Sequence, residues 1–153
     1  MINSGDRLEE GIGFGSKRIV SKDLFLYFLD LEVKRARRYQ NFYSILLLKL
    51  IRLSHQDDEN GIQSGLQILA DLLMGEIRES DILGSVGKNK LAILLPYADF
   101  SSGEHAKSRL EGNLKCCDFK SMGCEVTINQ VCFPINGTNA IDLIKKAMGA
   151  EPL

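Results

Sequence analysis

Arg78–Pro96, RESDILGSVGKNKLAILLP, contains two apolar segments separated by a short polar turn. Lys88 and Asn89 form the turn directly after Gly87, and both asparagine and glycine adopt the left-handed backbone conformations that hairpin turns need. The stretch therefore predicts a β-hairpin that closes at these residues. The two predicted strands are Ile82–Val86 and Leu91–Leu95.

The overall composition is that of a single soluble domain. The 153 residues include 44% apolar and 25% charged side chains, and the formal net charge is -1. A nearly neutral chain has no electrostatic reason to bind nucleic acid or a membrane surface. No apolar run is long enough to span a bilayer, and the first residues lack the apolar core of a signal peptide, so we expect a cytoplasmic protein. We expect residues 1–18 to form a flexible N-terminal tail and residues 19–153 to form the domain.

The cysteines and histidines do not form a metal-binding pattern. Cys116 and Cys117 are adjacent, no C-x-x-C pair is present, and only two histidines are available to complete a site. We therefore expect reduced thiols, and neither a metal nor another cofactor.

The periodicity of apolar residues predicts the other elements. Tyr43–Leu50, YSILLLKL, is a continuous apolar run, which is typical of a central strand covered on both faces. Ser101, with Glu104 three residues later, forms a capping box that predicts the start of a helix. The predicted order is helix 21–40, strand 43–50, helix 60–78, the hairpin, helix 101–115, strand 125–133 and a last helix after Thr138.

This order of elements, a helix followed by β-α-β-β-α-β and a last helix, indicates the fold class. Two crossovers on either side of one hairpin give a four-stranded sheet with an antiparallel central pair. We therefore expect an α/β fold (an α+β sandwich) of the ferredoxin-like kind, with helices packed over the sheet. That architecture serves many functions and identifies none of them.

Several segments, in the same order and at matching spacing, resemble the GGDEF domains. Phe25–Tyr39, FLYFLDLEVKRARRY, is similar to the family's F-x-x-x-L-x-x-E-x-x-R-A-x-R-Y helix, and Arg78–Pro96 resembles R-x-x-D-x-x-x-R-x-G-G-D-E-F with the strand that follows. Asp58, Gly61 and Gly65 match the loop after the family's first strand. Active members are diguanylate cyclases, which make cyclic di-GMP from two molecules of GTP. The resemblance therefore implies a bacterial signalling domain of the GGDEF fold.

The positions that carry the family's acidic residues are changed in this chain. The resemblance places Lys49 at the strand-end aspartate that would bind the first metal, and Asp57 and Leu66 at the residues that would recognise guanine. We also expect the family's C-terminal A-K-x-x-G-R-N segment to be missing, because the sequence ends at Leu153. In place of G-G-D-E-F, the hairpin reads Gly87, Lys88, Asn89, Lys90, Leu91.

From these changes we predict that the chain is not an enzyme. In cyclisation a 3′-hydroxyl attacks an α-phosphate and displaces pyrophosphate, and such transfers depend on metal ions that neutralise the developing charge. Magnesium needs hard oxygen ligands, whereas Lys49 and Lys90 would place ammonium groups where the cation sits. Leu66 cannot accept hydrogen bonds from the N–H groups of guanine, so we expect recognition of the substrate to be lost independently of the loss of metal binding.

A second family motif is retained. The resemblance places Arg78 and Asp81 at the R-x-x-D motif, which binds the product cyclic di-GMP in the family, and Arg109 at a further arginine on the helix after the hairpin. An arginine fork can bind guanine O6 and N7 or a phosphate, and a carboxylate can accept hydrogen bonds from guanine N1–H and the exocyclic amine. We therefore predict a cyclic di-GMP receptor that uses these three residues and acts on a separate effector protein.

Three other interpretations remain open. The domain could be a ligand-independent docking module that binds no nucleotide. Arg78 could have a purely structural role, in which its positive charge interacts favourably with the dipole at the C-terminal end of its helix and pairs with Asp81. Lys49, Lys88 and Lys90 could neutralise the phosphates of a different nucleotide without metal. The resemblance also leaves open a homodimer joined by the dinucleotide.

Overall fold

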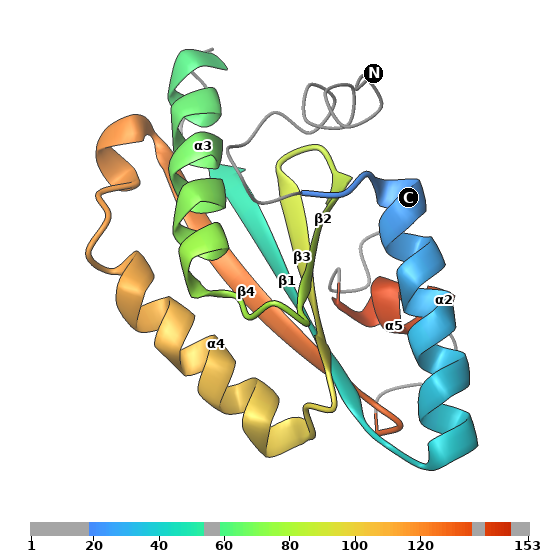
Figure 1. The fold of residues 1–153 in the computed structure, drawn as a ribbon. Coiled ribbons are helices and arrows are strands. Elements are labelled where there is room, and N and C mark those ends of the chain that lie inside the picture. Colours follow the sequence, from blue (N-terminus) through green and yellow to red (C-terminus); the bar gives the residue numbers. More distant parts are fainter. Residues whose placement is uncertain (1–18, 54–58, 136–139, 148–153) are drawn as a thin grey trace, which may run out of the picture.

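The computed structural model describes residues 19–53, 59–135 and 140–147 (Figure 1). The predicted tail over residues 1–18 and the loop positions Asp57 and Asp58 lie outside the described residues. The helices are α2 (Lys22–Tyr39), α3 (Glu59–Glu76), α4 (Phe100–Leu114) and α5 (Ala140–Ala147), with a short 3-10 helix η1 (Lys120–Met122), and the strands are β1 (Tyr43–Arg52), β2 (Ile82–Gly87), β3 (Lys90–Pro96) and β4 (Cys124–Phe133).

The strands form one four-stranded sheet in the order β2-β3-β1-β4. β1 lies inside the sheet and pairs antiparallel with β3 on one side and with β4 on the other. Residues 43–48 of β1 are all buried, as expected for a strand that is covered on both faces. The predicted α/β fold with an antiparallel central pair is therefore confirmed, and the hairpin places β2 at one edge of the sheet.

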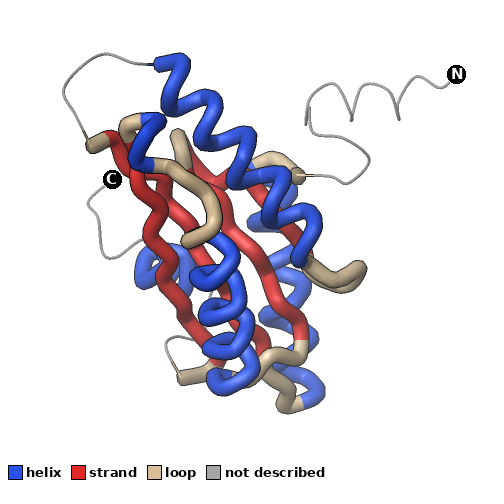
Figure 2. The backbone as a smooth tube through the Cα atoms, turned by 90° about the vertical axis from the view of Figure 1, so that its left-hand side faces the viewer, coloured by secondary structure: helices blue, strands red, loops and turns tan. Residues whose placement is uncertain are grey.

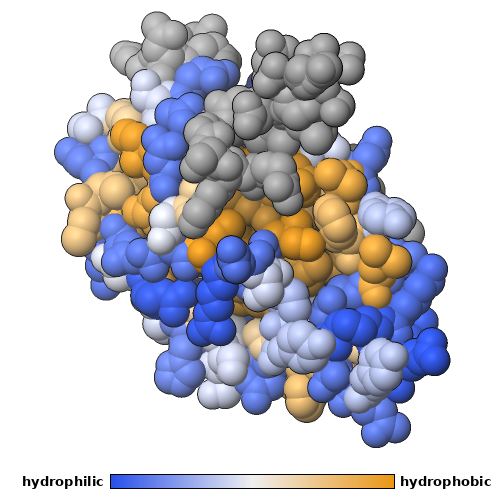
Figure 3. Space-filling model, in the orientation of Figure 1, coloured by the Kyte–Doolittle hydropathy of each residue, from blue (hydrophilic) through white to orange (hydrophobic). Residues whose placement is uncertain are grey.

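Helices cover both faces of this sheet. Figure 1 shows α3 and α4 on one side and α2 and α5 on the other, and Figure 2 shows α3 and α4 from the outside. The side chains of β1 alternate between the two layers: Leu46 and Leu48 pack with the α3 and α4 side, whereas Ile45 and Leu47 pack with α2 and α5. In Figure 3, hydrophobic residues gather in the middle of the view, where the sheet lies between the two helical layers.

Helix α2 is capped at its N-terminus by Ser21. The hydroxyl of Ser21 accepts a hydrogen bond from the N–H of Leu24 at 3.2 Å. Phe28 is only half-buried and packs at the margin of the core. The helix lies so close to β2 that a Cβ atom on Gly84 would be 2.6 Å from Cδ1 of Phe25. The buried stripe consists of Phe25, Leu29, Val33 and Ala36.

Helix α4 begins earlier than predicted. Its first residue is Phe100 and its N-cap is Asp99, so the capping box predicted at Ser101 is wrong. The carboxylate of Asp99 accepts a hydrogen bond from the N–H of Ser102 at 2.8 Å, and this bond holds the pKa of Asp99 below its usual range. Asp99 caps the helix because the chain turns into α4 soon after the end of β3 at Pro96, which leaves Ser101 inside the first turn.

Candidate functional site

The three residues of the predicted binding site lie around one pocket. Arg78 and Asp81 come from the connection between α3 and β2, and Arg109 comes from α4. The pocket has a volume of about 250 Å³, and we call it the Arg78 pocket. The rest of its lining comes from the α3–β2 connection, the end of β3, the chain that follows and α4: Ser80, Leu95, Pro96, Ala98, Ser102, His105 and Ala106. Residues that lie far apart in the sequence are thus brought together.

Asp81 is fixed by the backbone of Arg78. The N–H of Arg78 donates to Oδ2 of Asp81 at 2.8 Å, and the N–H of Asp81 donates to the carbonyl oxygen of Arg78 at 3.0 Å. Burial raises the pKa of Asp81, while the hydrogen bond from Arg78 and the positive charges of Arg78 and Arg109 act in the opposite direction. Within residues 19–53, 59–135 and 140–147, no ion pair joins the two side chains of the motif. The backbone, rather than the guanidinium, holds the carboxylate.

Arg109 has an acidic partner that the sequence did not indicate. Its Nε donates to Oε1 of Glu76 at 3.2 Å, and both side chains are partly exposed. This ion pair connects α4 to the last residue of α3 across a separation of 33 positions in the sequence. No local pattern marks such a pair, since the two residues meet only through the packing of two helices. An anionic ligand in the Arg78 pocket has to compete with Glu76 for this guanidinium.

The hairpin tip brings together two lysines at positions where the resemblance places acids. Lys49, in the C-terminal half of β1, lies directly opposite Lys90 in the β1–β3 ladder. Asn89 has a left-handed backbone with φ of 58°, as the turn prediction requires, and its carbonyl oxygen accepts a hydrogen bond from the N–H of Leu50 at 2.9 Å. Gly87 and Lys88 are exposed, while Leu91 is buried in the core. The tip is therefore tied to the end of the central strand.

The residues at this end of the sheet do not fit the magnesium ion that the family implies. Lys49 and Lys90 contribute two positive charges, and a neutral amide stands at Asn89. In the described part of the chain, no group of three or more His, Cys, Asp or Glu residues is placed to hold a metal. Leu66, at the guanine-recognition position of the family, is half-buried and packs against the core under α3.

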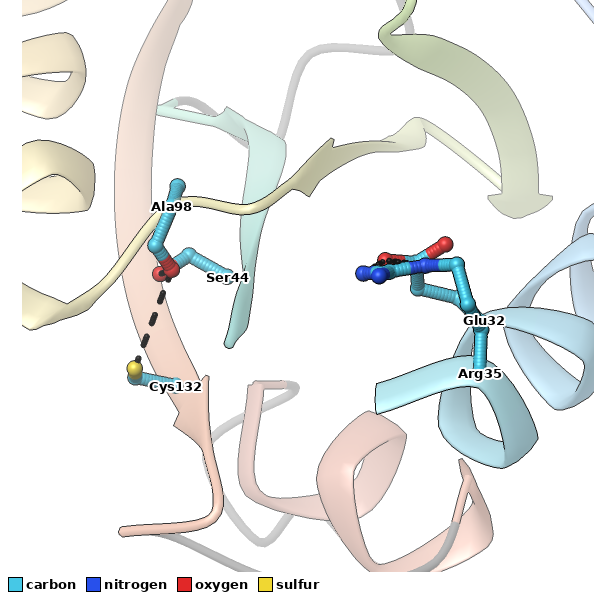
Figure 4. A network of polar contacts seen from close by, with 5 residues as sticks. All are labelled: Glu32, Arg35, Ser44, Ala98 and Cys132. Atoms are coloured by element: carbon cyan, nitrogen blue, oxygen red, sulfur yellow. Dashed lines mark hydrogen bonds and ion pairs between the residues drawn. The ribbon is translucent and has the colours of Figure 1, made fainter. Parts of the chain in front are cut away.

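The chain between β3 and α4, which contributes Ala98 to the wall of the Arg78 pocket, is contacted from both β1 and α2. Figure 4 shows Ser44 beside Ala98, and Arg35 beside Glu32. The hydroxyl of Ser44 donates to the carbonyl oxygen of Ala98 at 2.9 Å, and the guanidinium of Arg35 lies 4.0 Å from the ring centroid of Tyr97. Arg35 also forms an ion pair with Glu32 one turn earlier on α2. The E-x-x-R part of the helix motif thus positions this wall and does not enter the pocket. Burial raises the pKa of the Cys132 thiol beside it.

Solved structures of GGDEF domains share this fold. The GGDEF domain of YfiN from Pseudomonas aeruginosa is 19% identical, with a TM-score of 0.74 over 86% of this chain and 87% of that chain. The active GGEEF domain of a diguanylate cyclase from Vibrio cholerae is 14% identical, with a TM-score of 0.74 over 87% and 88%. The GGDEF domain of DgcB from Caulobacter crescentus, solved in complex with c-di-GMP, is 11% identical, with a TM-score of 0.69 over 89% and 82%.

The family of the chain is identified from its sequence. The family described as "Diguanylate cyclase, GGDEF domain" matches residues 18–150, which is nearly the whole chain, so the chain belongs to the GGDEF family. It is a signalling domain of that family. No curated protein sequence matches it. Among the helices that the structure describes, none is both long and apolar enough to cross a membrane.

Proposed function

We propose that this GGDEF domain binds cyclic di-GMP as a receptor and does not synthesise it. The observation that carries the proposal is the Arg78 pocket, where Arg78, Asp81 and Arg109 line one cavity of about 250 Å³. The resemblance of these residues to the family's product-binding motif predicts the ligand, and their clustering supports it. Solved GGDEF domains in complex with c-di-GMP show that the family fold can hold this dinucleotide.

The chemistry of the pocket suits one half of the dinucleotide. A volume of about 250 Å³ lies just below the usual range of pockets that enclose a whole small molecule, roughly 300–1,000 Å³, so we expect one guanine and its phosphate to enter. Arg78 and Arg109 offer two guanidinium groups for guanine or phosphate. Asp81 is held with its carboxylate in the lining, where it can accept hydrogen bonds from guanine N1–H and the exocyclic amine.

The hairpin tip supports the loss of cyclase activity. Lys49 and Lys90 lie opposite each other, and their positive charges repel a divalent cation. Cyclisation depends on metal ions at the reacting phosphates. Leu66 offers no polar atom to a guanine. Chromatography of purified protein incubated with GTP and either Mg²⁺ or Mn²⁺ should reveal no cyclic di-GMP. Product formation above a no-protein blank would contradict this part of the proposal.

Isothermal titration calorimetry with cyclic di-GMP tests the binding. We expect Arg78→Ala and Arg109→Ala each to weaken binding by roughly 10- to 100-fold, the equivalent of about 1.5–3 kcal/mol for a charged hydrogen bond. Arg38→Ala is the matched control, because Arg38 is an exposed arginine at the end of α2 and does not line the pocket. No heat at high micromolar ligand, or unchanged binding in Arg78→Ala, would refute the receptor.

The docking alternative makes a different prediction. A ligand-independent docking module would retain a partner from cell lysate equally well with and without cyclic di-GMP, and would give no calorimetric signal with the dinucleotide. A receptor that acts on a separate effector should instead retain that partner differently when the ligand is added, and Arg78→Ala should remove the difference.

A further inference from the structure

A second and larger cavity lies on the other side of α4. It has a volume of about 850 Å³, which is within the usual range for ligand pockets, roughly 300–1,000 Å³. One wall is the C-terminal part of α4 and the chain that follows, with Leu114 and Phe119 at its apolar base. The other wall is residues 124–128 of β4. We call this cavity the β4 groove.

The β4 groove runs along the edge of a strand. β4 is the last strand of the sheet, and among the described residues no strand pairs with its outer side. Successive side chains of a strand point to opposite faces, yet five consecutive residues of β4 line the groove. A cavity lined by residues from both faces of the strand lies beside the strand edge, where the backbone N–H and C=O groups point, rather than over one face of the sheet.

The hydrogen-bond pattern shows which backbone groups point into the groove. The N–H of Leu53 donates to the carbonyl oxygen of Gly123 at 2.8 Å, in the same register as the β1–β4 ladder. Antiparallel ladders alternate, so the odd-numbered residues of β4 bond to β1 and the even-numbered residues point outward. The N–H and C=O groups of Val126 and Ile128 therefore face the groove. Cys124 follows the same rule, since its N–H donates outward to the carbonyl oxygen of Phe119 at 3.1 Å.

Both ends of this free edge are already closed. Near the start of β4, the contact between Cys124 and Phe119 occupies the edge. Near the start of α4, the side-chain amide of Gln130 donates to the carbonyl oxygen of Phe100 at 3.1 Å. Between these points Val126 and Ile128 line the β4 groove, and within the described part of the chain their outward N–H and C=O groups have no backbone partner. A short stretch of unsatisfied edge, flanked by a helix and a cavity, is the arrangement that binds an added strand.

We propose that the β4 groove binds an extended peptide segment of a partner protein as an additional strand on β4. Its backbone would pair with the outward N–H and C=O groups of Val126 and Ile128. A side chain beside Val126 would point toward α4 and meet Leu114 and Phe119, which favours an apolar residue. On the opposite face the neighbouring strand residue is the exposed Glu125, which favours lysine or arginine. The recognised segment is therefore extended, with alternating apolar and basic residues.

Amide exchange and a pair of synthetic peptides test this proposal. In the free protein, NMR should show fast hydrogen exchange at Val126 and Ile128 and slow exchange at Thr127, which pairs with Lys49. A peptide of alternating valine and arginine should slow exchange at Val126 and Ile128 and bind at least about tenfold tighter than a peptide of alternating valine and glutamate, a difference typical of complementary rather than opposed charges.

Three variants separate strand pairing from other modes of binding. Val126→Pro removes the outward N–H without touching the bonds to β1 and should weaken binding of the arginine peptide by about tenfold, whereas Val126→Ala keeps the N–H and should retain binding. Glu125→Lys should reverse the preference between the two peptides, while the exposed Glu79→Lys makes the same change of net charge and should leave it unaltered.

Several results would overturn the proposal. One is slow exchange at Val126 and Ile128 in the free protein, and another is equal binding of the two peptides. A third is wild-type affinity in a folded Val126→Pro variant, which would mean that the groove holds side chains without pairing a strand. If Val126→Pro does not fold, the exchange data and Glu125→Lys decide the question.

Discussion

Replacing Gly84 with alanine tests how closely α2 packs on the sheet. The added Cβ would lie 2.6 Å from Cδ1 and 2.8 Å from Cβ of Phe25, which is completely buried. Because the Cβ of Phe25 is fixed to the helix backbone, rotation of the ring cannot relieve the overlap, and α2 has to move away from β2. Overpacking of this kind costs about 2–3 kcal/mol, so the melting temperature should fall by about 4–12 °C for a domain of this size.

Thermal unfolding followed by circular dichroism measures the effect. Gly112→Ala is the matched control, because a Cβ at this position of α4 has no neighbour within 4 Å. Alanine in a helix should there stabilise the protein by about 0.4–1 kcal/mol, so the two identical substitutions should have opposite signs. A melting temperature that is unchanged or raised in Gly84→Ala would show that α2 does not approach β2 as the structure describes.

Three further predictions concern the pocket and the cap of α2. The pKa of Asp81 is raised, and only the ionised carboxylate accepts hydrogen bonds from both guanine N–H groups, so calorimetry should show the affinity for cyclic di-GMP starting to fall at a higher pH than it would with an ordinary carboxyl group. Asp81→Asn should bind weakly at every pH. The same pH dependence in Asp81→Asn as in the wild type would argue against a role of Asp81 in guanine binding. Glu76→Gln frees Arg109 and should raise the affinity by a factor of about 1.4–5, the range for a partly exposed ion pair, whereas a loss of affinity would show that Glu76 does not compete. Ser21→Ala should cost about 1 kcal/mol in urea denaturation, and Ser21→Asp should retain the cap; an equal loss in both would mean that the hydroxyl does not cap α2.

The main strands could be predicted from the sequence because their signals are local. The continuous apolar run after Tyr43 and the turn at Asn89 both depend on neighbouring residues, and the structure has a strand and a hairpin at these places. The start of α4 was mispredicted for the same reason. Asp99 and Ser101 both have side chains that can cap a helix, and which one does so depends on where β3 releases the chain.

Only part of the candidate site could be inferred in this way. The spacing of Arg78 and Asp81 resembles a family motif, and the structure places both beside Arg109 in one pocket. The ion pair between Glu76 and Arg109 depends on how two helices pack, so no spacing in the sequence reveals it. The β4 groove depends on the register of the ladder and on the angle of α4. Shifting that register by one residue would turn the groups of Val126 inward.

Helix α4 contributes to both proposed binding regions. Its first turns are pinned to the sheet, since a Cβ on Gly103 would lie 2.8 Å from Oγ of Ser44. Farther along, it supplies Arg109 to the Arg78 pocket and then Leu114 to the β4 groove. The helix is also packed against the core farther along, at Leu110 and Leu114, so both regions are lined by one helix that is held along its length. For the two proposed occupants, thermodynamic linkage requires reciprocity: any factor by which cyclic di-GMP changes the affinity for the added strand is also the factor by which that strand changes the affinity for cyclic di-GMP.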